Sequence, residues 1–175
     1  MSAPVRACIG LGGNMGEVAA TLRSALAAID ALPATRLLRT SRFYRTPAWG
    51  VQAQPDFINA VAVLETTLGA RALLEALLAI ERDHGRERAE DGSRWGPRTL
   101  DLDLLLHGDA VVDEPGLVVP HPLLHVRAFV LVPLAEVAPD AIVPGLGRAD
   151  ALLAGIDASG IAPSGPGEPA RGVRS

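Results

Sequence analysis

Residues 99–106 have the sequence TLDLDLLL, which is apolar enough for a buried strand yet carries two carboxylates two positions apart. Strand side chains alternate between faces, so Asp101 and Asp103 are expected on one face. The other face is expected to carry Leu100, Leu102, Leu104 and Leu106. Two like charges so placed are costly unless a cation or a ring of donors neutralises them. The pattern indicates a divalent-metal site, and a solvated edge strand is the plainer alternative.

Four arginines lie just before this strand, at Arg86, Arg88, Arg94 and Arg98. The chain as a whole is acidic, with a net charge of -4. It therefore lacks the global basic field that drives nonspecific binding to nucleic acids, and any anion site must be local. Arginines beside paired carboxylates indicate a substrate that carries phosphate and metal together.

The composition excludes several classes of enzyme. The chain has 175 residues, of which 49% are hydrophobic, and this is enough for one domain with a real core. All 16 basic residues are arginine. Without a lysine the chain cannot be a P-loop enzyme, a protein kinase or a Schiff-base enzyme.

The single cysteine and the start of the chain bear on localisation. Cys8 has apolar neighbours and no cysteine partner, which favours a buried thiol in a reducing compartment. No charged-then-apolar leader opens the chain, and its longest apolar helix pattern is too short to cross a bilayer. We expect a cytoplasmic monomer without a membrane partner.

The first half of the chain predicts three strands and a helix. The strands are expected over 5–11, up to about Tyr44 and over 57–65, with the helix starting near Glu17. On the third strand, alternation places Phe57 and Asn59 on one face with Val61 and Val63.

The second half adds an amphipathic helix over 70–83, a hairpin around 113–116 and a helix over 128–137. The order βαββαβ predicts an α+β fold, a ferredoxin-like plait whose antiparallel sheet has helices packed on it. We expect one domain over residues 1–157. Residues 158–175 are rich in Gly, Pro, Ser and Arg and are expected to be a flexible tail.

With these segments placed, the sequence resembles the 6-hydroxymethyl-7,8-dihydropterin pyrophosphokinases over about residues 5–150. The resemblance rests on IGLGGN (9–14), SRFYRTP (41–47), QPDFINA (54–60), RWGPRTLDLD (94–103), VPH (119–121) and RAF (127–129). It implies transfer of pyrophosphate from ATP to the hydroxymethyl group of the pterin, with release of AMP, in folate biosynthesis. It also implies two Mg²⁺ ions, with ATP and the pterin as the small-molecule partners.

The resemblance further implies a role for each matching residue. Asp101 and Asp103 match the metal ligands, and together with Arg86 and Arg98 they form the catalytic set. The expected ATP-binding residues are Glu81, Arg88, Trp95, Leu104, His121 and Arg127. The expected pterin-binding residues are Thr46, Pro47, Ala48, Trp49, Phe57, Asn59 and Phe129.

Several alternatives remain at this stage. Another two-metal phosphoryl or nucleotidyl transferase would pair strand carboxylates in the same way. An RNA-binding plait is disfavoured by the net negative charge and by the lack of its aromatic strand pattern. His121 could make a purely structural hydrogen bond, and Phe57 could belong to the core. Gly12 and Gly13 indicate either backbone crowding near the pterin or a plain turn.

Overall fold

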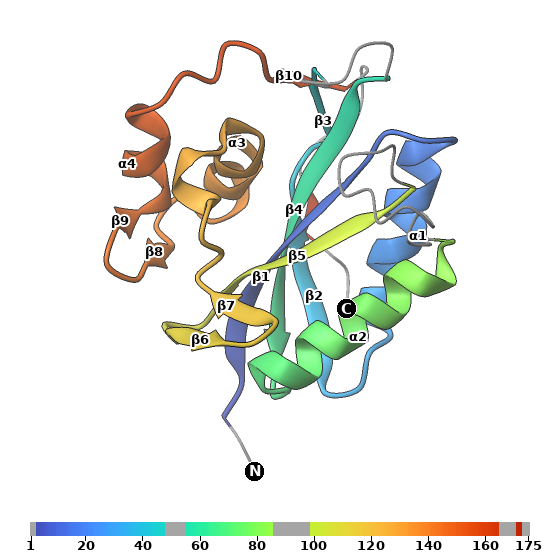
Figure 1. Ribbon diagram of the computed structural model, residues 1–175, viewed down its shortest axis with the longest axis vertical. Coiled ribbons are helices and arrows are strands. Elements are labelled where there is room, and N and C mark those ends of the chain that lie inside the picture. The colour runs from blue at the N-terminus through green and yellow to red at the C-terminus, as the bar shows by residue number, and fades with distance from the viewer. Residues whose placement is uncertain (1–2, 48–54, 86–98, 165–170, 173–175) are drawn as a thin grey trace.

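An antiparallel sheet forms the centre of the molecule in the computed structural model, and helices cover both of its faces (Figure 1). The structure describes residues 3–47, 55–85, 99–164 and 171–172. The main strands are β1 (Val5–Gly13), β2 (Thr35–Thr40), β3 (Tyr44–Thr46), β4 (Phe57–Thr66) and β5 (Asp101–His107). The helices are α1 (Val18–Asp30), α2 (Ala70–Asp83), α3 (Ala128–Val137), α4 (Ala149–Ala154) and the 3₁₀ turn η1 (Leu124–Val126).

Strand β4 is the centre of the sheet. It pairs with β1 on one side and with both β2 and β3 on the other, while β5 pairs with the far edge of β1. This is the strand order of a ferredoxin-like plait, so the predicted fold class is confirmed. The shorter strands are β6 (Val112–Glu114), β7 (Leu117–Val119), β8 (Ile142–Val143), β9 (Gly147–Arg148), β10 (Ala162–Pro163) and β11 (Arg171–Gly172).

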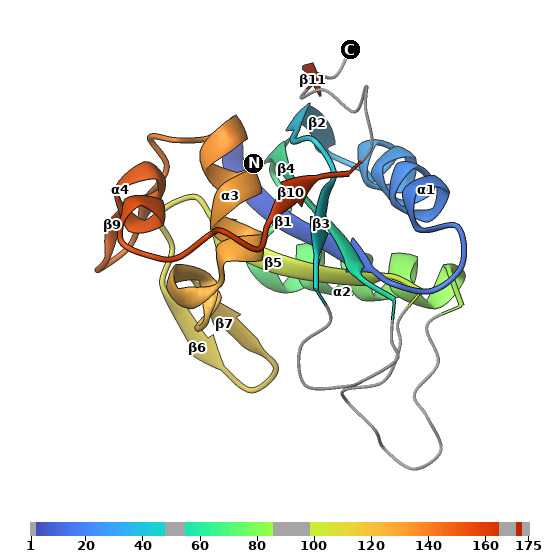
Figure 2. The same ribbon diagram turned by 90° about the horizontal axis from the view of Figure 1, so that it is seen from above.

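The sheet separates two apolar cores. Helices α1 and α2 pack on one face, and α3 and α4 pack on the other (Figure 2). Strand β4 serves both cores because its side chains alternate, with Ala62 and Leu64 in the first core and Val61 and Val63 in the second. The predicted alternation of this strand is confirmed, which places Phe57 and Asn59 on the face that α3 covers.

Strand β5 departs from the predicted alternation near its end. Its register against β1 shifts between the partners of Cys8 and Ile9, so that Ile9 opposes Leu104 while Cys8 opposes Leu106. Leu105 is the extra residue of this bulge. Leu106 therefore packs in the core under α3 and not, as predicted, with the even-numbered leucines before it.

The second predicted strand is in fact two strands. Ser41 interrupts it because the serine hydroxyl takes over part of the ladder with Val61. The Val61 N–H donates to Ser41 Oγ at 3.0 Å, and the Ser41 N–H donates to the Val61 carbonyl at 2.9 Å. The chain then turns, and β3 begins at Tyr44.

Part of the segment predicted to be a flexible tail pairs with the sheet. Strand β10 pairs with β3, the Ser164 N–H donates to the Phe43 carbonyl at 2.8 Å, and β11 pairs with β2. These contacts add two short strands to the edge formed by β2 and β3. The boundary at residue 157 remains a prediction.

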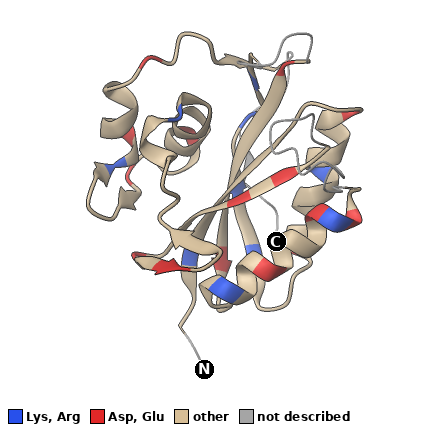
Figure 3. Ribbon diagram, viewed as in Figure 1, with Lys and Arg blue, Asp and Glu red and all other residues tan. Residues whose placement is uncertain are grey.

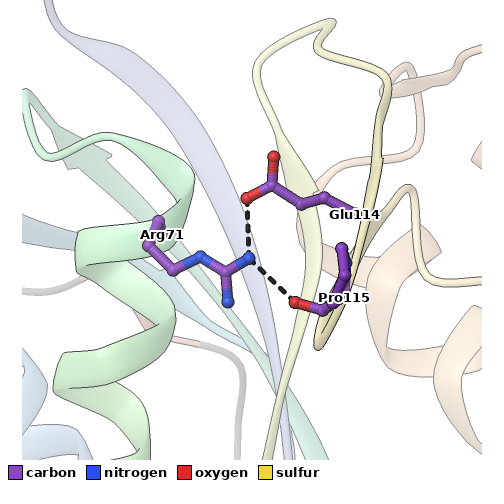
Figure 4. Close-up of polar contacts among 3 residues, drawn as sticks. All are labelled: Arg71, Glu114 and Pro115. Carbon is purple, nitrogen blue, oxygen red and sulfur yellow. Dashed lines mark hydrogen bonds and ion pairs between the residues drawn. The ribbon is translucent and has the colours of Figure 1, made fainter.

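Helices α2 and α3 begin and end where the sequence predicts. Arg71 joins the start of α2 to the β6–β7 hairpin. Its Nη2 donates to Glu114 Oε1 at 2.6 Å and to the Pro115 carbonyl at 2.9 Å (Figure 4). No helix in the described ranges combines the length and the apolar character needed to span a membrane.

Candidate active site

The antiparallel register brings the predicted pterin-binding and metal-binding residues onto one face of the sheet. Across β3, β4, β1 and β5, Tyr44 opposes Asn59, Asn59 opposes Gly12, and Gly12 opposes Asp101. Residues directly opposite each other in antiparallel strands share a face. These four positions therefore form one row across the sheet, on the face that α3 covers.

The neighbouring rows extend this site in both directions. Thr46 opposes Phe57 in the row on one side of it, and Gly10 opposes Asp103 in the row on the other side. Phe57, Asp101 and Asp103 are all half-buried, so each is still open to a ligand. The two glycines of β1 leave a strip without side chains between the residues expected to bind the pterin and the carboxylates.

Asn59 and Thr46 form a buried polar pair at the β3 end of this face. Asn59 is 9% exposed and Thr46 is 3% exposed. Asn59 Nδ2 donates to Thr46 Oγ1 at 3.0 Å. A buried amide held in this way can present its remaining hydrogen-bonding atoms to the edge of a flat heterocycle.

Helix α3 contributes an aromatic ring and a cation. Phe129 lies near the start of α3 and packs partly against the core under that helix. The Arg127 guanidinium lies over its ring, 5.4 Å from the ring centroid. This cation–π contact groups a residue expected to bind ATP with one expected to stack on the pterin.

His121 lies beside β5 because its backbone N–H donates to the Leu105 carbonyl. Leu105 is the bulge residue and has no partner on β1. The Leu123 N–H donates to His121 Nδ1 at 3.2 Å, so the neutral ring carries its proton on Nε2. Burial lowers the pKa of His121, repulsion from Arg127 lowers it further, and attraction to Asp101 acts in the opposite sense. The charges of Arg127, just before α3, and of Asp101, on β5, thus both act on the His121 ring.

We expect His121 to titrate below its ordinary pKa of 6.5 and to be neutral at pH 7. The unfolded chain then binds this proton more readily than the folded chain, so stability falls as the pH drops from 6.5 through the folded pKa. NMR of the histidine ring carbons measures the midpoint, and His121→Asn should flatten that part of the stability curve. A midpoint at or above the ordinary value would contradict the expectation.

Two predicted ATP-binding residues lie away from this face. Leu104 is buried in the core under α1 and α2, so only its backbone could contact a ligand. Glu81 belongs to α2, and its Oε2 accepts the Leu102 N–H at 2.6 Å. Glu81 thus joins α2 to β5 at the residue that lies between the two aspartates.

Six of the predicted site residues lie outside the described part of the chain: Ala48, Trp49, Arg86, Arg88, Trp95 and Arg98. Pro47 is described and directly follows β3. The roles given to all of these residues remain predictions.

A polar contact that the sequence did not indicate joins α3 to the site. The Tyr44 hydroxyl donates to Glu136 Oε1, and the Arg42 N–H donates to the same carboxylate at 3.1 Å. Tyr44 could have been noticed because it stands two positions before Thr46 on a short strand. Glu136 lies 92 residues further along the chain, and no local pattern pairs the two.

Burial raises the pKa of Tyr44, and the hydrogen bond to Glu136 and the carboxylate charge raise it further. Tyr44 is the one tyrosine in the sequence, so tyrosinate absorbance reports this residue alone. We expect no tyrosinate signal from the folded protein near pH 10 and an earlier onset in Glu136→Gln. Because the folded pKa is raised, the contribution of Tyr44 to stability is complete below pH 10. It is lost progressively as the pH rises from 10 through the raised pKa. A wild-type midpoint at the ordinary value of 10.0 would contradict this.

The donor set on β5 fits magnesium. Asp101 and Asp103 supply hard carboxylate oxygens on one strand face, where β5 is marked as acidic in Figure 3. Magnesium prefers oxygen ligands and usually takes one or two carboxylates, with substrate phosphates and water completing its shell. Among the described residues, no group of three or more acidic, histidine or cysteine side chains is placed to hold a metal.

Comparison with known proteins gives a consistent result. The family model described as 7,8-dihydro-6-hydroxymethylpterin-pyrophosphokinase (HPPK) matches residues 8–139. A 2-amino-4-hydroxy-6-hydroxymethyldihydropteridine pyrophosphokinase of Methylorubrum extorquens is 46% identical over 156 residues, covering 89% of this chain and 96% of that protein. The protein of the same name from Synechocystis is 43% identical over 162 residues, covering 92% of this chain and 81% of that protein.

Solved structures agree on the fold. The Plasmodium falciparum HPPK-DHPS with pterin and p-hydroxybenzoate superposes with a TM-score of 0.68 at 13% identity, covering 87% of this chain. This chain spans 42% of that longer one, and at such low identity the likeness supports the fold alone. The family model covers residues 8–139 and the relatives share close to half of their aligned residues with this protein, so the chain belongs to the 7,8-dihydro-6-hydroxymethylpterin-pyrophosphokinase family.

Proposed function

We propose that the chain transfers the terminal pyrophosphoryl group of ATP to the hydroxymethyl oxygen of 6-hydroxymethyl-7,8-dihydropterin in folate biosynthesis. The hydroxymethyl oxygen forms a bond to the β-phosphorus, and the bond from that phosphorus to the α–β bridging oxygen breaks. AMP leaves with the bonding electron pair, and the hydroxyl proton passes to solvent. The observation that carries the proposal is the sheet face shared by Thr46, Asn59 and Asp101 in a member of this family.

The β3–β4 end of that face suits the pterin. Phe57 is half-buried on the face, and Phe129 approaches from α3, so the two rings could stack on opposite sides of a flat heterocycle. The Asn59 amide, held by Thr46, would bind the polar edge of the pterin. Pro47, Ala48 and Trp49 follow β3 directly and would complete this pocket.

The β5 end suits the triphosphate. His121 offers Nε2–H, and the charges of both Arg127 and Asp101 act on its ring. The arginines at 86, 88 and 98 and Trp95 would bind and shield the phosphates, because guanidinium groups donate to phosphate in pairs. Glu81 and the backbone of Leu104 would border the nucleotide from the edge of β5.

Asp101 and Asp103 would hold two Mg²⁺ ions. When bound, the metal would neutralise the triphosphate and lower the pKa of the attacking hydroxyl. The two carboxylates share one strand face and would hold the ions there, while the arginines would balance the charge that remains on the phosphates. This arrangement needs no protein group as a general base, because the hydroxyl proton passes to solvent.

A product assay with Mg-ATP and 6-hydroxymethyl-7,8-dihydropterin tests the proposal. We expect AMP that forms only when the pterin is present, measured by ion-exchange chromatography. A matched reaction without pterin controls for ATP hydrolysis. Release of ADP or of free pyrophosphate would contradict the proposal and favour another phosphoryl or nucleotidyl transferase, and so would a folded protein without turnover.

We also propose that the protein is a monomer in the cytoplasm. The buried thiol of Cys8 supports a reducing compartment, where such a thiol needs no disulfide partner. Sedimentation equilibrium would check the assembly state, and a mass of twice the 18.2 kDa chain would contradict a monomer.

A further inference from the structure

Gly12 stands at the centre of the row that joins the two halves of the site. It opposes Asn59 on β4 and Asp101 on β5. A Cβ atom built on Gly12 would lie 2.5 Å from Asn59 Oδ1 and 3.5 Å from the Ile58 carbonyl oxygen. Real Cβ atoms essentially never approach an oxygen to 2.5 Å. The Asn59 amide therefore uses space that any other residue at position 12 would fill.

The Asn59 amide is not free to move out of the way. Its Nδ2 donates to Thr46 Oγ1 at 3.0 Å, and both residues are buried. Shifting the amide to admit a Cβ would lengthen or break this hydrogen bond in a place that water reaches poorly. Losing a buried hydrogen bond leaves a polar group without a partner, which is costly where water is excluded.

The missing side chain also keeps space open across the sheet. Neighbouring strands lie about 4.8 Å apart, so the backbones of Asn59 and Asp101 are separated by about 10 Å with Gly12 between them. In the proposed reaction the hydroxymethyl group and the β-phosphate must meet between the amide and the carboxylate. A side chain on this face of β1 would stand in that interval.

We propose that Gly12 is a positioning residue that determines specificity for the pterin. By lacking a Cβ, it lets the Asn59 amide take the one position in which Thr46 holds it, and so fixes the polar edge to which the heterocycle binds. The inference rests on the proposed function, because the ligand is the pterin of that reaction. It adds a residue of β1 to a pocket otherwise assigned to β3, β4 and α3.

Gly10 shows that this crowding is not general along β1. It lies two positions before Gly12 on the same face and opposes Val61 and Asp103. A Cβ on Gly10 would meet the Leu105 side chain at 3.6 Å, which is ordinary van der Waals contact. The crowding is therefore specific to position 12 and does not follow merely from a glycine in β1.

A double-mutant cycle tests the proposal through steady-state kinetics. We expect Gly12→Ala to raise the KM for pterin by about 30-fold, while the KM for ATP changes by less than about twofold. Gly69→Ala is the control, because Gly69 is exposed just before α2 and a Cβ there would meet nothing within 4 Å; it should change neither value by more than about twofold. In the Asn59→Ala background, Gly12→Ala should add less than about threefold, because the clashing amide is gone. Full additivity, or an equal rise in both KM values, would overturn the proposal.

Thermal unfolding of the four proteins of the cycle, the wild type, Gly12→Ala, Asn59→Ala and the double variant, gives a second readout that needs no activity. Gly12→Ala should lower Tm, and adding Asn59→Ala should restore part of the loss because it removes the atom that the new Cβ meets. If the single variant fails to fold, recovery of folding in the double variant supports the proposal. A double variant no more stable than Gly12→Ala would overturn it.

The two proposals can fail separately. If wild-type protein makes no pterin-dependent AMP, the proposed function fails, and the unfolding cycle still tests whether Gly12 makes room for Asn59. If the wild type is active but Gly12→Ala and Asn59→Ala act independently, the Gly12 inference fails while the function stands.

Discussion

Asp101→Asn is expected to lower kcat for pterin-dependent AMP formation by about a thousandfold, which corresponds to about 4 kcal/mol of transition-state stabilisation. The substitution keeps the size of the side chain but removes its charge. Asp101 and Asp103 oppose Gly12 and Gly10 on the same face, so the remaining carboxylate would have to balance the metal charge alone. Asp103→Asn should have an effect of similar size.

The effect should be separable from loss of folding. Both aspartates are half-buried, and asparagine matches aspartate in size, so the packing of β5 should be kept. We therefore expect Asp101→Asn to unfold at a urea concentration close to that of the wild type in the absence of Mg²⁺. Added Mg²⁺ with ATP should stabilise the wild type more than the variant.

Asp113→Asn is the matched control, because Asp113 is an exposed aspartate on strand β6. The same change of charge there should alter kcat by less than about twofold. If Asp101→Asn kept more than about a tenth of the wild-type kcat, the proposed metal site on β5 would be wrong.

The sequence predicts those elements whose signal is local. The bounds of α2 and α3 agree with the structure because each has a continuous apolar pattern with a clear end. The shared face of Phe57 and Asn59 also follows from simple alternation along an unbroken strand.

The errors arise where a single residue changes the register. Leu106 moves to the other core because Leu105 is an extra residue in β5, and alternation alone cannot reveal a bulge. The strand predicted to end near Tyr44 breaks because the Ser41 hydroxyl replaces a backbone group in the ladder. Neither event leaves a pattern in the local sequence.

Part of the candidate site depends on residues far apart in the chain. The pairing of Glu136 with Tyr44 and the approach of Asn59 to Gly12 become visible only once the strands and α3 are placed. The paired aspartates of β5 could be predicted from the local sequence alone, because two charges in an apolar strand require an explanation.

Glu81→Ala is expected to lower the free energy of unfolding by about 3 kcal/mol, as a lost hydrogen bond to a buried charged group would. Glu81 is 3% exposed, and its Oε2 accepts the Leu102 N–H at 2.6 Å. Strand β5 is at the end of the sheet path, so this carboxylate binds its outer edge. Removing it leaves a strand N–H without this acceptor.

The same substitution should reduce activity through the two aspartates that we propose as metal ligands. Leu102 lies between Asp101 and Asp103, so a shift of the backbone here moves both carboxylates. We expect kcat to fall by about tenfold or more, because small errors in the placement of reacting groups are costly. Glu81→Gln keeps an acceptor oxygen and should recover most of the stability.

Glu75→Ala is the control, because Glu75 is an exposed glutamate of the same helix and its loss should cost less than about 0.5 kcal/mol. Urea unfolding measures stability, and steady-state kinetics measures kcat and the KM for ATP. If Glu81 acted only by contacting ATP, Glu81→Ala would raise the KM for ATP and leave the unfolding curve unchanged. A variant with reduced stability that Glu81→Gln restores, together with a lowered kcat, instead identifies Glu81 as the group that fixes β5 and its two aspartates.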